Sequence, residues 1–261
     1  MNDLELIRDA ARTVGETARE LRSEGLLTRD KGGGMGPVTN ADLEVDALLK
    51  AMLMQARPEY GWLSEETADD PARLSRERLF VVDPIDGTVS FMKGLSYWAV
   101  SIAVVEAGKP IAAVVHAPDL NETYVAEAGG GARLNGEAIV ASGASLVENC
   151  GMLGDAKMFG HPAWPRPWPD MRIETRNSIA YRLCLVADGR FDAALALSAK
   201  NEWDVAAADL ICAEAGASLT DHKGRLFAYN KPVPSMPSVV CAAPGLHPLI
   251  LDRVRHIDLS R

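Results

Sequence analysis

The stretch LFVVDPIDGTVSF, residues 79–91, joins a buried strand to a group of polar side chains, and the rest of the fold can be worked out around it. Its apolar start is typical of a strand that is covered on both faces. Asp83 stands at the carboxyl end of this strand, and Asp86 follows three residues later. Because Pro84 stiffens the chain between them, both carboxylates can face one point. The stretch therefore predicts two carboxylates at one edge of a sheet.

These two carboxylates suit a hard cation such as Mg²⁺, which prefers oxygen ligands. Ile85, between Asp83 and Asp86, can bury its side chain and turn its backbone carbonyl toward the same ion. Gly87 lets a ligand approach the backbone, and Thr88 offers a hydroxyl and an N–H at a helix start, where phosphate is favoured. On spacing alone, a simple polar turn after a buried strand is an equally good interpretation.

Further carboxylates stand in three other segments. PVTNAD ends in Asp42, and WLSEET carries Glu65 and Glu66. Asp204, in the segment EWD, opens the helical pattern VAAADLICAEAG. Taken alone, an Asp at a helix start is more often only a cap.

Helical periodicity marks the beginning of the chain. Apolar residues recur at steps of three and four through the first 25 residues, which predicts an amphipathic helix that stops at Gly25. A second helical pattern ends before Pro58, and Asn40 or Asp42 is expected to cap it.

Strands dominate the middle of the chain and alternate with helices in its last third. Short Val- and Ile-rich runs begin at residue 61, with a hairpin turn at 106–109 and a further turn at 135–136. The later strands are expected near 172–176, 191–195, 217–220 and 238–242, and the later helices near 178–188, 204–215 and 246–255. This alternation predicts layers of sheet and helix.

The composition is that of an ordinary globular protein, with 261 residues of which 48% are hydrophobic and 24% charged. The formal net charge of -9 argues against nucleic-acid polymers and anionic membranes as partners. Small anionic substrates stay open, because bound cations can reverse the local charge. The sequence has no membrane span and no signal peptide, which predicts a cytoplasmic protein.

Four segments occur in the order typical of one enzyme family: PVTNAD, WLSEE, DPIDGT and WDVAAADLICAEAG. With this ordered set the chain resembles the inositol monophosphatase family of Mg²⁺-dependent, lithium-sensitive phosphatases. The resemblance implies two or three Mg²⁺ ions per subunit, a small phosphorylated substrate and a homodimer. It also implies an α/β (α+β) fold, the layered αβαβα sandwich of the inositol monophosphatase/fructose-1,6-bisphosphatase type.

A composition shift near 140–150 is the candidate boundary between two parts of this fold. Residues 1–145 form an expected N-terminal α+β part with most of the metal ligands. Residues 146–261 form an expected C-terminal α/β part that completes the metal and substrate site.

Carried over to this chain, the resemblance implies roles for residues of the matched segments. The implied metal ligands are Glu65, Asp83, the carbonyl of Ile85, Asp86 and Asp204, with Asp42 holding a further, weaker metal or its water. The implied catalytic residues are Glu65, Thr88 and Asp86, and the implied substrate contacts are Gly87, Thr88, Asp86, Ser178 and Asp204. Lys31 is a further match in the loop KGGGMG.

The implied reaction is the hydrolysis of a phosphate monoester. The charge of the ester repels nucleophiles, and clustered cations answer this by neutralising oxygens and lowering the pKa of bound water. Glu65 and Thr88 would position that water for in-line attack on phosphorus. A regulatory binding protein that keeps the fold and lacks the reaction is the alternative from another class.

The substrate-selecting positions depart from the inositol-specific pattern of the family. Inositol-specific members carry a Gly-Ser/Thr-Ala segment and a carboxylate seven residues before the last metal Asp. This chain has Asn177-Ser178-Ile179-Ala180 and Leu197 at those positions. A Leu side chain cannot accept hydrogen bonds from ring hydroxyls.

The segment NSIAYRLCLVADGRFDAAL is more similar to a bacterial branch that hydrolyses 3'-phosphoadenosine 5'-phosphate to AMP and phosphate. The resemblance therefore favours a 3'(2'),5'-bisphosphate nucleotidase, with Arg182, Lys200 and Arg190 as candidates for holding the second phosphate. The alternatives are inositol-1-monophosphatase, histidinol-phosphatase and fructose bisphosphatase activity.

Thiol chemistry is a rival interpretation. Cys184 and Arg190 have the C-x5-R spacing of cysteine phosphatases. However, the residues after Cys184 continue an apolar helical face, and Asp188 would put negative charge where phosphate should bind. A buried core thiol is the better interpretation. His116 is likewise interpreted as a strand-end residue and not as a ligand.

Overall fold

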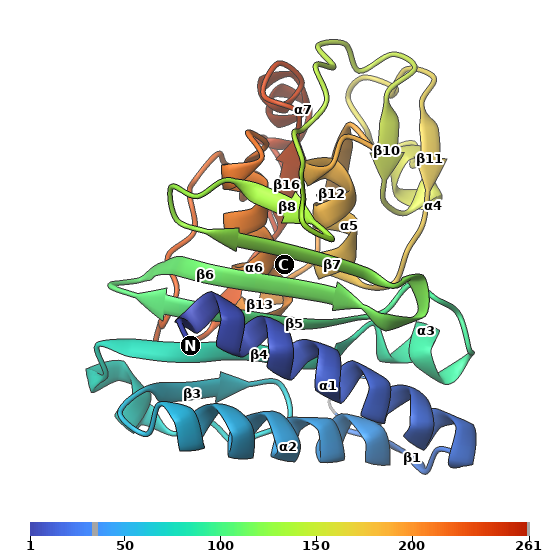
Figure 1. Ribbon diagram of the computed structural model, residues 1–261. Helices are drawn as coiled ribbons and strands as arrows, with labels where there is room; N and C mark the ends of the chain where they lie inside the picture. Colours follow the sequence, from blue (N-terminus) through green and yellow to red (C-terminus); the bar gives the residue numbers. More distant parts are fainter. Residues whose placement is uncertain (33–35, 260–261) are drawn as a thin grey trace.

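Two large sheets and three layers of helices make up the computed structural model of the protein, which describes residues 1–32 and 36–259 (Figure 1). The helices are α1 (Asp3–Glu24), α2 (Asn40–Ala56), α3 (Thr88–Met92), α4 (Ala156–Phe159), α5 (Ile179–Ala187), α6 (Glu202–Glu214) and α7 (His247–Val254). Two short 3-10 helices add Pro71–Ser75 and Pro118–Leu120.

The larger sheet has seven strands that follow the chain order. They are β3 (Gly61–Ser64), β4 (Arg78–Asp86), β5 (Ala99–Glu106), β6 (Lys109–Ala117), β7 (Glu122–Glu127), β8 (Ala132–Leu134) and β9 (Glu137–Ala138). Strand β3 runs parallel to β4, and the remaining neighbours are antiparallel. The predicted hairpin at 106–109 joins β5 to β6, and the predicted turn at 135–136 joins β8 to β9.

The smaller sheet has five strands in a mixed order. From one edge to the other they are β11 (Arg172–Glu174), β10 (Gly151–Leu153), β12 (Ala193–Ala196), β16 (Val239–Ala242) and β14 (Ser218–Thr220). Two short ribbons pair β1 (Thr28–Asp30) with β2 (Pro37–Thr39) and β13 (Lys200–Asn201) with β15 (Ser235–Met236).

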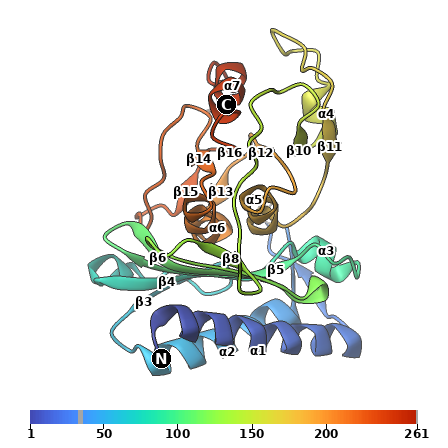
Figure 2. The same ribbon diagram turned by 45° about the horizontal axis from the view of Figure 1, so that its top comes forward.

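The layers follow one another as α1 and α2, the larger sheet, α5 and α6, the smaller sheet, and α7 (Figure 2). Side chains of α1 and α2 share a core with Phe80 and Val82 of β4. Side chains of α5 and α6 share the next core with Leu79 and Val81, because neighbouring residues of a strand face opposite ways. This stacking confirms the predicted αβαβα sandwich. Helices α5 and α6 pack between the two sheets and join them into one stack. The division of the chain at residue 145 stays a prediction.

The starts of two helices differ from the prediction. Thr39 is the N-cap of α2, and its hydroxyl accepts from the backbone of the first turn. Asn40 is the first helical residue, and its side chain accepts from Leu27 N instead. Helix α6 begins at Glu202, so Asp204 lies inside its first turn.

Within residues 1–32 and 36–259, no helix combines the length and apolar character that crossing a membrane requires.

Candidate active site

Asp83 and Asp86 reach the same side of the larger sheet because β4 is bulged between them. Residues three apart on a regular strand face opposite ways. Their partners on β5, Ser101 and Ala99, are only two residues apart. The bulge therefore places both side chains on the same face of the sheet. Pro84 fits there because it has no N–H to contribute to the ladder. The side chain of Ile85 consequently packs with α1 and α2, and the carboxylates face α5 and α6.

The N-terminus of α5 holds Asp86. Ser178 Oγ and Ala180 N each donate to Asp86 Oδ2 over 2.6 Å, and Ile179 N donates to Oδ1 over 3.2 Å. Burial raises the pKa of Asp86 to about 6, and the three hydrogen bonds oppose this rise. The positive end of the helix thus stabilises a carboxylate that water hardly reaches.

Gly87 lets α5 lie this close to the end of β4. Its φ is +95°, and a Cβ here would lie 3.1 Å from both Ser178 N and Tyr97 O. Any other residue would be strained in its backbone and crowded by neighbouring backbone atoms. The glycine in DPIDGT is therefore explained by packing.

The prediction that Ser178 contacts substrate is corrected. Its side chain is completely buried. Its hydroxyl donates its proton to Asp86 and accepts from Tyr181 N, so its hydrogen bonds lie inside the protein. Ser178 caps α5 and positions Asp86.

Glu65, Asp83 and Asp204 meet beside the end of β4. Each offers one carboxylate oxygen, and these oxygens lie within 4.8 Å of one another. Glu65 follows β3 and Asp204 lies on α6, so segments far apart in the chain converge. Burial and the charges of the neighbouring carboxylates raise the pKa of Asp83 well above its usual range, and that of Asp204 to about 7.

A buried carboxylate that sequence analysis missed holds the turn that carries Glu65. Asp46, on α2, accepts hydrogen bonds from Ser64 Oγ and Thr67 Oγ1, on the two sides of Glu65 and Glu66. Its position one turn after Asp42 was the available signal, because residues four apart share a helix face.

Lys31 lies against this turn and binds both of its glutamates, Glu65 and Glu66. Lys31 Nζ donates to Glu65 Oε1 over 2.7 Å and to Glu66 Oε1 over 2.6 Å. Burial, together with the charge of Glu65, raises the pKa of Glu66 to about 7, although Lys31 opposes the rise. Burial lowers the pKa of Lys31, but the hydrogen bonds and charges of both glutamates outweigh it and raise that pKa. Residues 33–35 of the same glycine-rich loop lie outside the described residues.

Asp42 and Thr88 complete the polar lining. Thr88 Oγ1 lies 3.2 Å from Asp42 Oδ1 and 3.2 Å from the carbonyl oxygen of Ile85. Asp42 Oδ2 accepts from Thr39 N over 2.8 Å and from Thr39 Oγ1 over 2.6 Å. Burial raises the pKa of Asp42, whereas the hydrogen bonds from Thr39 and Thr88 lower it.

The donor set fits a hard divalent cation. The converging groups are carboxylates, with one backbone carbonyl at hand, and oxygen ligands of this kind suit Mg²⁺. Burial and, after it, the mutual repulsion of the gathered carboxylates raise their pKa values, and a bound cation would offset that repulsion. No cysteine or histidine belongs to the group that converges within the described part of the chain.

A pocket of about 580 Å³ opens beside Asp86 and Asp204. Its other lining residues are Asp155, Met158, Asn177, Ile179, Arg182, Leu195, Ala196, Leu197, Ser198, Ala199 and Lys200. Two of the three predicted cations, Arg182 and Lys200, therefore lie in its wall, as does Leu197. A larger hollow of about 820 Å³ between α1 and the end of α3 contains none of the converging carboxylates.

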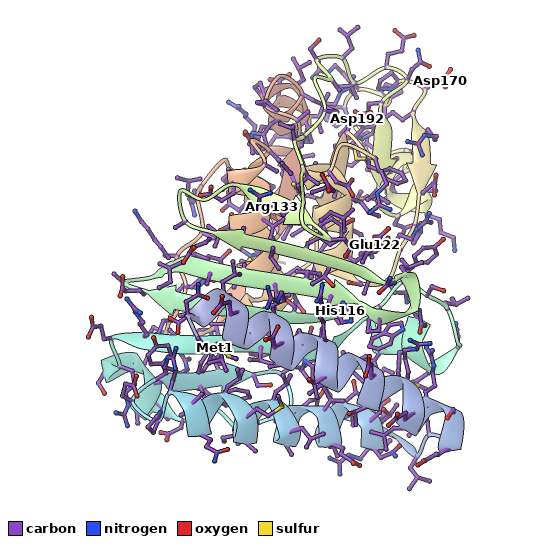
Figure 3. All side chains as sticks on the ribbon, viewed as in Figure 1. Met1, His116, Glu122, Arg133, Asp170 and Asp192 are labelled. Atoms are coloured by element: carbon purple, nitrogen blue, oxygen red, sulfur yellow. The ribbon has the colours of Figure 1, made fainter. Side chains whose placement is uncertain are left out.

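Arg190 is the third predicted cation, and the structure corrects its assignment. Its guanidinium donates to both carboxylate oxygens of Glu122 over 2.7 and 2.8 Å and to Asp188 over 2.7 Å. Glu122 lies on β7, beside the middle helical layer (Figure 3). Arg190 is thus committed to a structural ion-pair network and does not line the pocket.

The structure agrees with the predictions for Cys184 and His116. Cys184 is completely buried in α5, and burial raises the pKa of its thiol well above the usual range. His116 lies at the end of β6 under α1 (Figure 3). Its Nδ1 lies 3.0 Å from Thr123 Oγ1, and burial lowers its pKa to about 4. Neither residue reaches the carboxylates.

Comparisons with known proteins point to one enzyme family. The sequence model of the Inositol monophosphatase family matches residues 2–259. The chain is 36% identical over 197 residues to a fructose-1,6-bisphosphatase/inositol-1-monophosphatase of Thermotoga maritima, covering 75% of each. It is 34% identical over 208 residues to a histidinol-phosphatase of Mycobacterium tuberculosis, covering 76% of this chain and 79% of the relative. A solved Thermotoga maritima IMPase superposes with a TM-score of 0.85 at 30% identity, over 98% of each chain.

Proposed function

The chain belongs to the inositol monophosphatase family, a family of Mg²⁺-dependent phosphatases, and we propose that its own activity depends on Mg²⁺ held by the converging carboxylates. The observation that carries the proposal is the meeting of Glu65, Asp83 and Asp204 beside the pocket. Three segments far apart in the sequence bring negative charge to one buried place, at a cost in stability that a bound cation offsets.

Metal binding is assigned to the side chains of this cluster. Glu65, Asp83, Asp86 and Asp204, with the carbonyl of Ile85, would hold two or three Mg²⁺ ions, and Asp42 would hold the most weakly bound one. When bound, Mg²⁺ neutralises phosphate oxygens and lowers the pKa of water.

The chain's own groups would orient the reactants. Glu65 and the hydroxyl of Thr88 position the attacking water, and Asp42 restrains that hydroxyl through its hydrogen bond. The N–H groups of Gly87 and Thr88 donate to the phosphate. Asp86 faces the pocket while α5 holds it in place.

The preferred substrate class is a nucleoside 3'(2'),5'-bisphosphate, which makes the protein a bisphosphate nucleotidase. Support comes from the likeness of residues 177–195 to that branch and from Leu197, which lines the pocket without a hydrogen-bond acceptor for a ring hydroxyl. Inositol 1-phosphate and histidinol phosphate are the next candidates, because relatives carry those activities in their names.

A substrate panel with Mg²⁺ titration tests both levels of the proposal. Phosphate release is measured from 3'-phosphoadenosine 5'-phosphate, inositol 1-phosphate, histidinol phosphate and fructose 1,6-bisphosphate, with EDTA and iodoacetamide as controls. We expect EDTA to abolish release, iodoacetamide to leave it unchanged, and the nucleotide to have the highest kcat/KM. A preference for inositol phosphate overturns the nucleotidase assignment. Absence of Mg²⁺-dependent release from the whole panel favours a non-catalytic binding protein.

The homodimer implied by the family is a separate proposal. Light scattering coupled to gel filtration tests it, and a monomeric mass at micromolar concentration contradicts it.

A further inference from the structure

Glu202 is a buried carboxylate that the proposed reaction does not use. It is the first residue of α6, two positions before Asp204, and its side chain is completely buried. Its Oε2 accepts from Asn230 N over 2.7 Å, and its Oε1 accepts from Lys231 N over 3.1 Å. The ammonium of Lys231 lies 4.0 Å from Oε1. A buried carboxylate is costly unless donors or cations satisfy it, so residues 230–231 are held against the start of the helix.

Arg73 holds the same two residues from the other side. It lies in the 3-10 helix Pro71–Ser75 and is 2% exposed. Its guanidinium donates to Asn230 Oδ1 over 2.7 Å and to the carbonyl oxygen of Lys231 over 2.9 Å. It also donates to both carboxylate oxygens of Asp69, over 2.6 and 2.9 Å. The bonds engage all three nitrogens of the guanidinium, which fixes its orientation inside the protein.

Arg73, Asn230, Lys231 and Glu202 thus form a polar link between two segments that carry proposed metal ligands. At one end, the 3-10 helix follows the turn of Glu65 in the chain, and at the other end α6 carries Asp204 in its first turn. Oxygens of these two ligands lie within 4.8 Å of each other. Because the polar link consists of backbone groups and fully engaged side chains, it restrains the separation of the two segments.

Asp204 depends directly on the geometry of this helix start. Its Oδ2 accepts from Asn201 N over 2.7 Å. Asn201 pairs with Ser235 in the ribbon of β13 and β15, and Glu202 N donates to the carbonyl oxygen of Pro234 over 2.9 Å. A shift of residues 230–236 would therefore move the backbone group that orients Asp204.

A second contact between this loop and α6 allows an internal comparison. Tyr229 is buried, and its hydroxyl donates to Asp209 Oδ2 over 2.7 Å. Asp209 lies further along α6, away from its first turn. The loop is thus attached to the helix without the polar link, and what the link adds is the connection to the segment of Glu65.

We propose that Arg73 and Glu202 are positioning residues, which hold Glu65 and Asp204 at the spacing that a divalent cation requires. The proposal rests on the proposed metal site and gives neither positioning residue a contact with metal or substrate. Mg²⁺ demands near-ideal geometry of its oxygen ligands, so a small displacement of one segment weakens binding. Residues that support metal ligands typically contribute about 10-fold to 100-fold in affinity.

The Mg²⁺ affinity of the full chain tests the polar link. Titration calorimetry is applied to the wild type, Glu202→Gln, Arg73→Lys and Asn230→Gly, and thermal melting is recorded with and without Mg²⁺. Glu202→Gln turns an amide N–H toward a backbone donor, and Arg73→Lys keeps the charge but loses the forked donors. Asn230→Gly removes one acceptor at a φ of +61°, which glycine adopts freely. Tyr229→Phe is the matched control, because it loosens the same loop at its other contact with α6.

We expect each of the three link variants to bind Mg²⁺ about tenfold more weakly, and to gain less melting temperature from Mg²⁺ than the wild type does. Glu202→Gln combined with Arg73→Lys should weaken binding little further, because either change breaks the same link. Tyr229→Phe should lower the melting temperature and keep the wild-type Mg²⁺ affinity. If the two buried substitutions prevent folding, Asn230→Gly alone decides.

Link variants that melt at a lower temperature but bind Mg²⁺ as tightly as the wild type would overturn the proposal, because their role would be structural only. The same loss of affinity in Tyr229→Phe would overturn it too, since any loosening of the loop would then suffice. Both outcomes leave the phosphatase assignment intact. If the wild type binds no Mg²⁺ and releases no phosphate with it, the proposed function fails and the positioning role fails with it.

Discussion

The two sides of the pocket are built in different ways. On one side, Asp86 lies at the end of a central strand next to Asp83. Both are almost fully buried, and three donors at the N-terminus of α5 hold Asp86. On the other side, Met158, Leu197 and Lys200 come from a short helix and from the segment around β13, and they remain partly exposed. The first side depends on the packing of the layers, whereas the second consists of side chains that can change without disturbing those layers.

We expect the buried carboxylates to carry the chemistry and the partly exposed wall to select the substrate. A carboxylate at a strand end cannot move without the sheet and the helices that surround it, so the reacting side is rigid. Leu197 on the opposite wall is partly exposed, so we expect that an acidic residue in its place would change substrate preference at little structural cost.

Asp83→Asn should abolish most of the activity and stabilise the metal-free protein. The substitution removes a proposed metal ligand, so we expect kcat/KM to fall more than about 100-fold, beyond the loss seen for residues that only support ligands. It also removes one of several mutually repelling buried charges, so the melting temperature without Mg²⁺ should rise. Wild-type turnover at saturating Mg²⁺ would contradict the assignment.

Asp46→Asn should weaken Mg²⁺ binding without removing a ligand. An amide offers one acceptor oxygen, whereas Asp46 accepts from two hydroxyls that hold the turn of Glu65. We expect Mg²⁺ affinity, measured by calorimetry, to fall about 10-fold to 100-fold. Asp209→Asn is the matched control, because Asp209 accepts from Tyr229 OH away from the cluster. Equal effects of both variants would mean that Asp46 acts only on overall stability.

The contrast also explains which features could be predicted from the sequence. The paired carboxylates of DPIDGT could be predicted because the strand, the proline and the glycine that place them are neighbours in the sequence. Asp46 was missed because its partners lie on another element. Ser178 and Arg190 were assigned to substrate because their spacing cannot tell a pocket residue from one whose bonds are already used inside the protein.

The metal-free protein should lose stability as the pH rises from about 4 to about 7 and should change little above that. Folding raises the pKa of Asp204 and of Glu66 to about 7, so the folded state holds protons that the unfolded state has already released. Stability therefore falls as pH rises toward 7, and Mg²⁺ should reverse the fall. His116 has a lowered pKa and acts in the opposite direction, up to its ordinary pKa of about 6.5. We expect a drop of a few °C in the melting temperature. Asp204→Asn should make the melting temperature of the metal-free protein depend less on pH. An unchanged pH dependence would contradict the contribution of Asp204.

Leu197→Glu should shift selection and leave the chemistry in place. The new carboxylate would accept a hydrogen bond from a substrate hydroxyl, worth about 1 kcal/mol or roughly fivefold in kcat/KM. The ratio of inositol 1-phosphate to adenosine 3',5'-bisphosphate turnover should rise accordingly, and Leu197→Met should not change it. Loss of all activity in both variants would show that the wall is part of the reacting side.

Cys184→Ala should have the smallest effect on the reaction. The thiol is completely buried, and burial raises its pKa, so it stays uncharged. We therefore expect the substitution to lower the stability of the fold through lost packing and to leave kcat at saturating Mg²⁺ unchanged. A large loss of kcat in a folded variant would revive thiol chemistry.

The most direct test of the central claim is a crystal structure with Mn²⁺ in place of Mg²⁺, located by its anomalous scattering. The account predicts a peak bonded to the carboxylates of Glu65, Asp83 and Asp204, and loss of that peak in Asp83→Asn. An enzyme that is active with Mn²⁺ but shows no peak between these three side chains would contradict it.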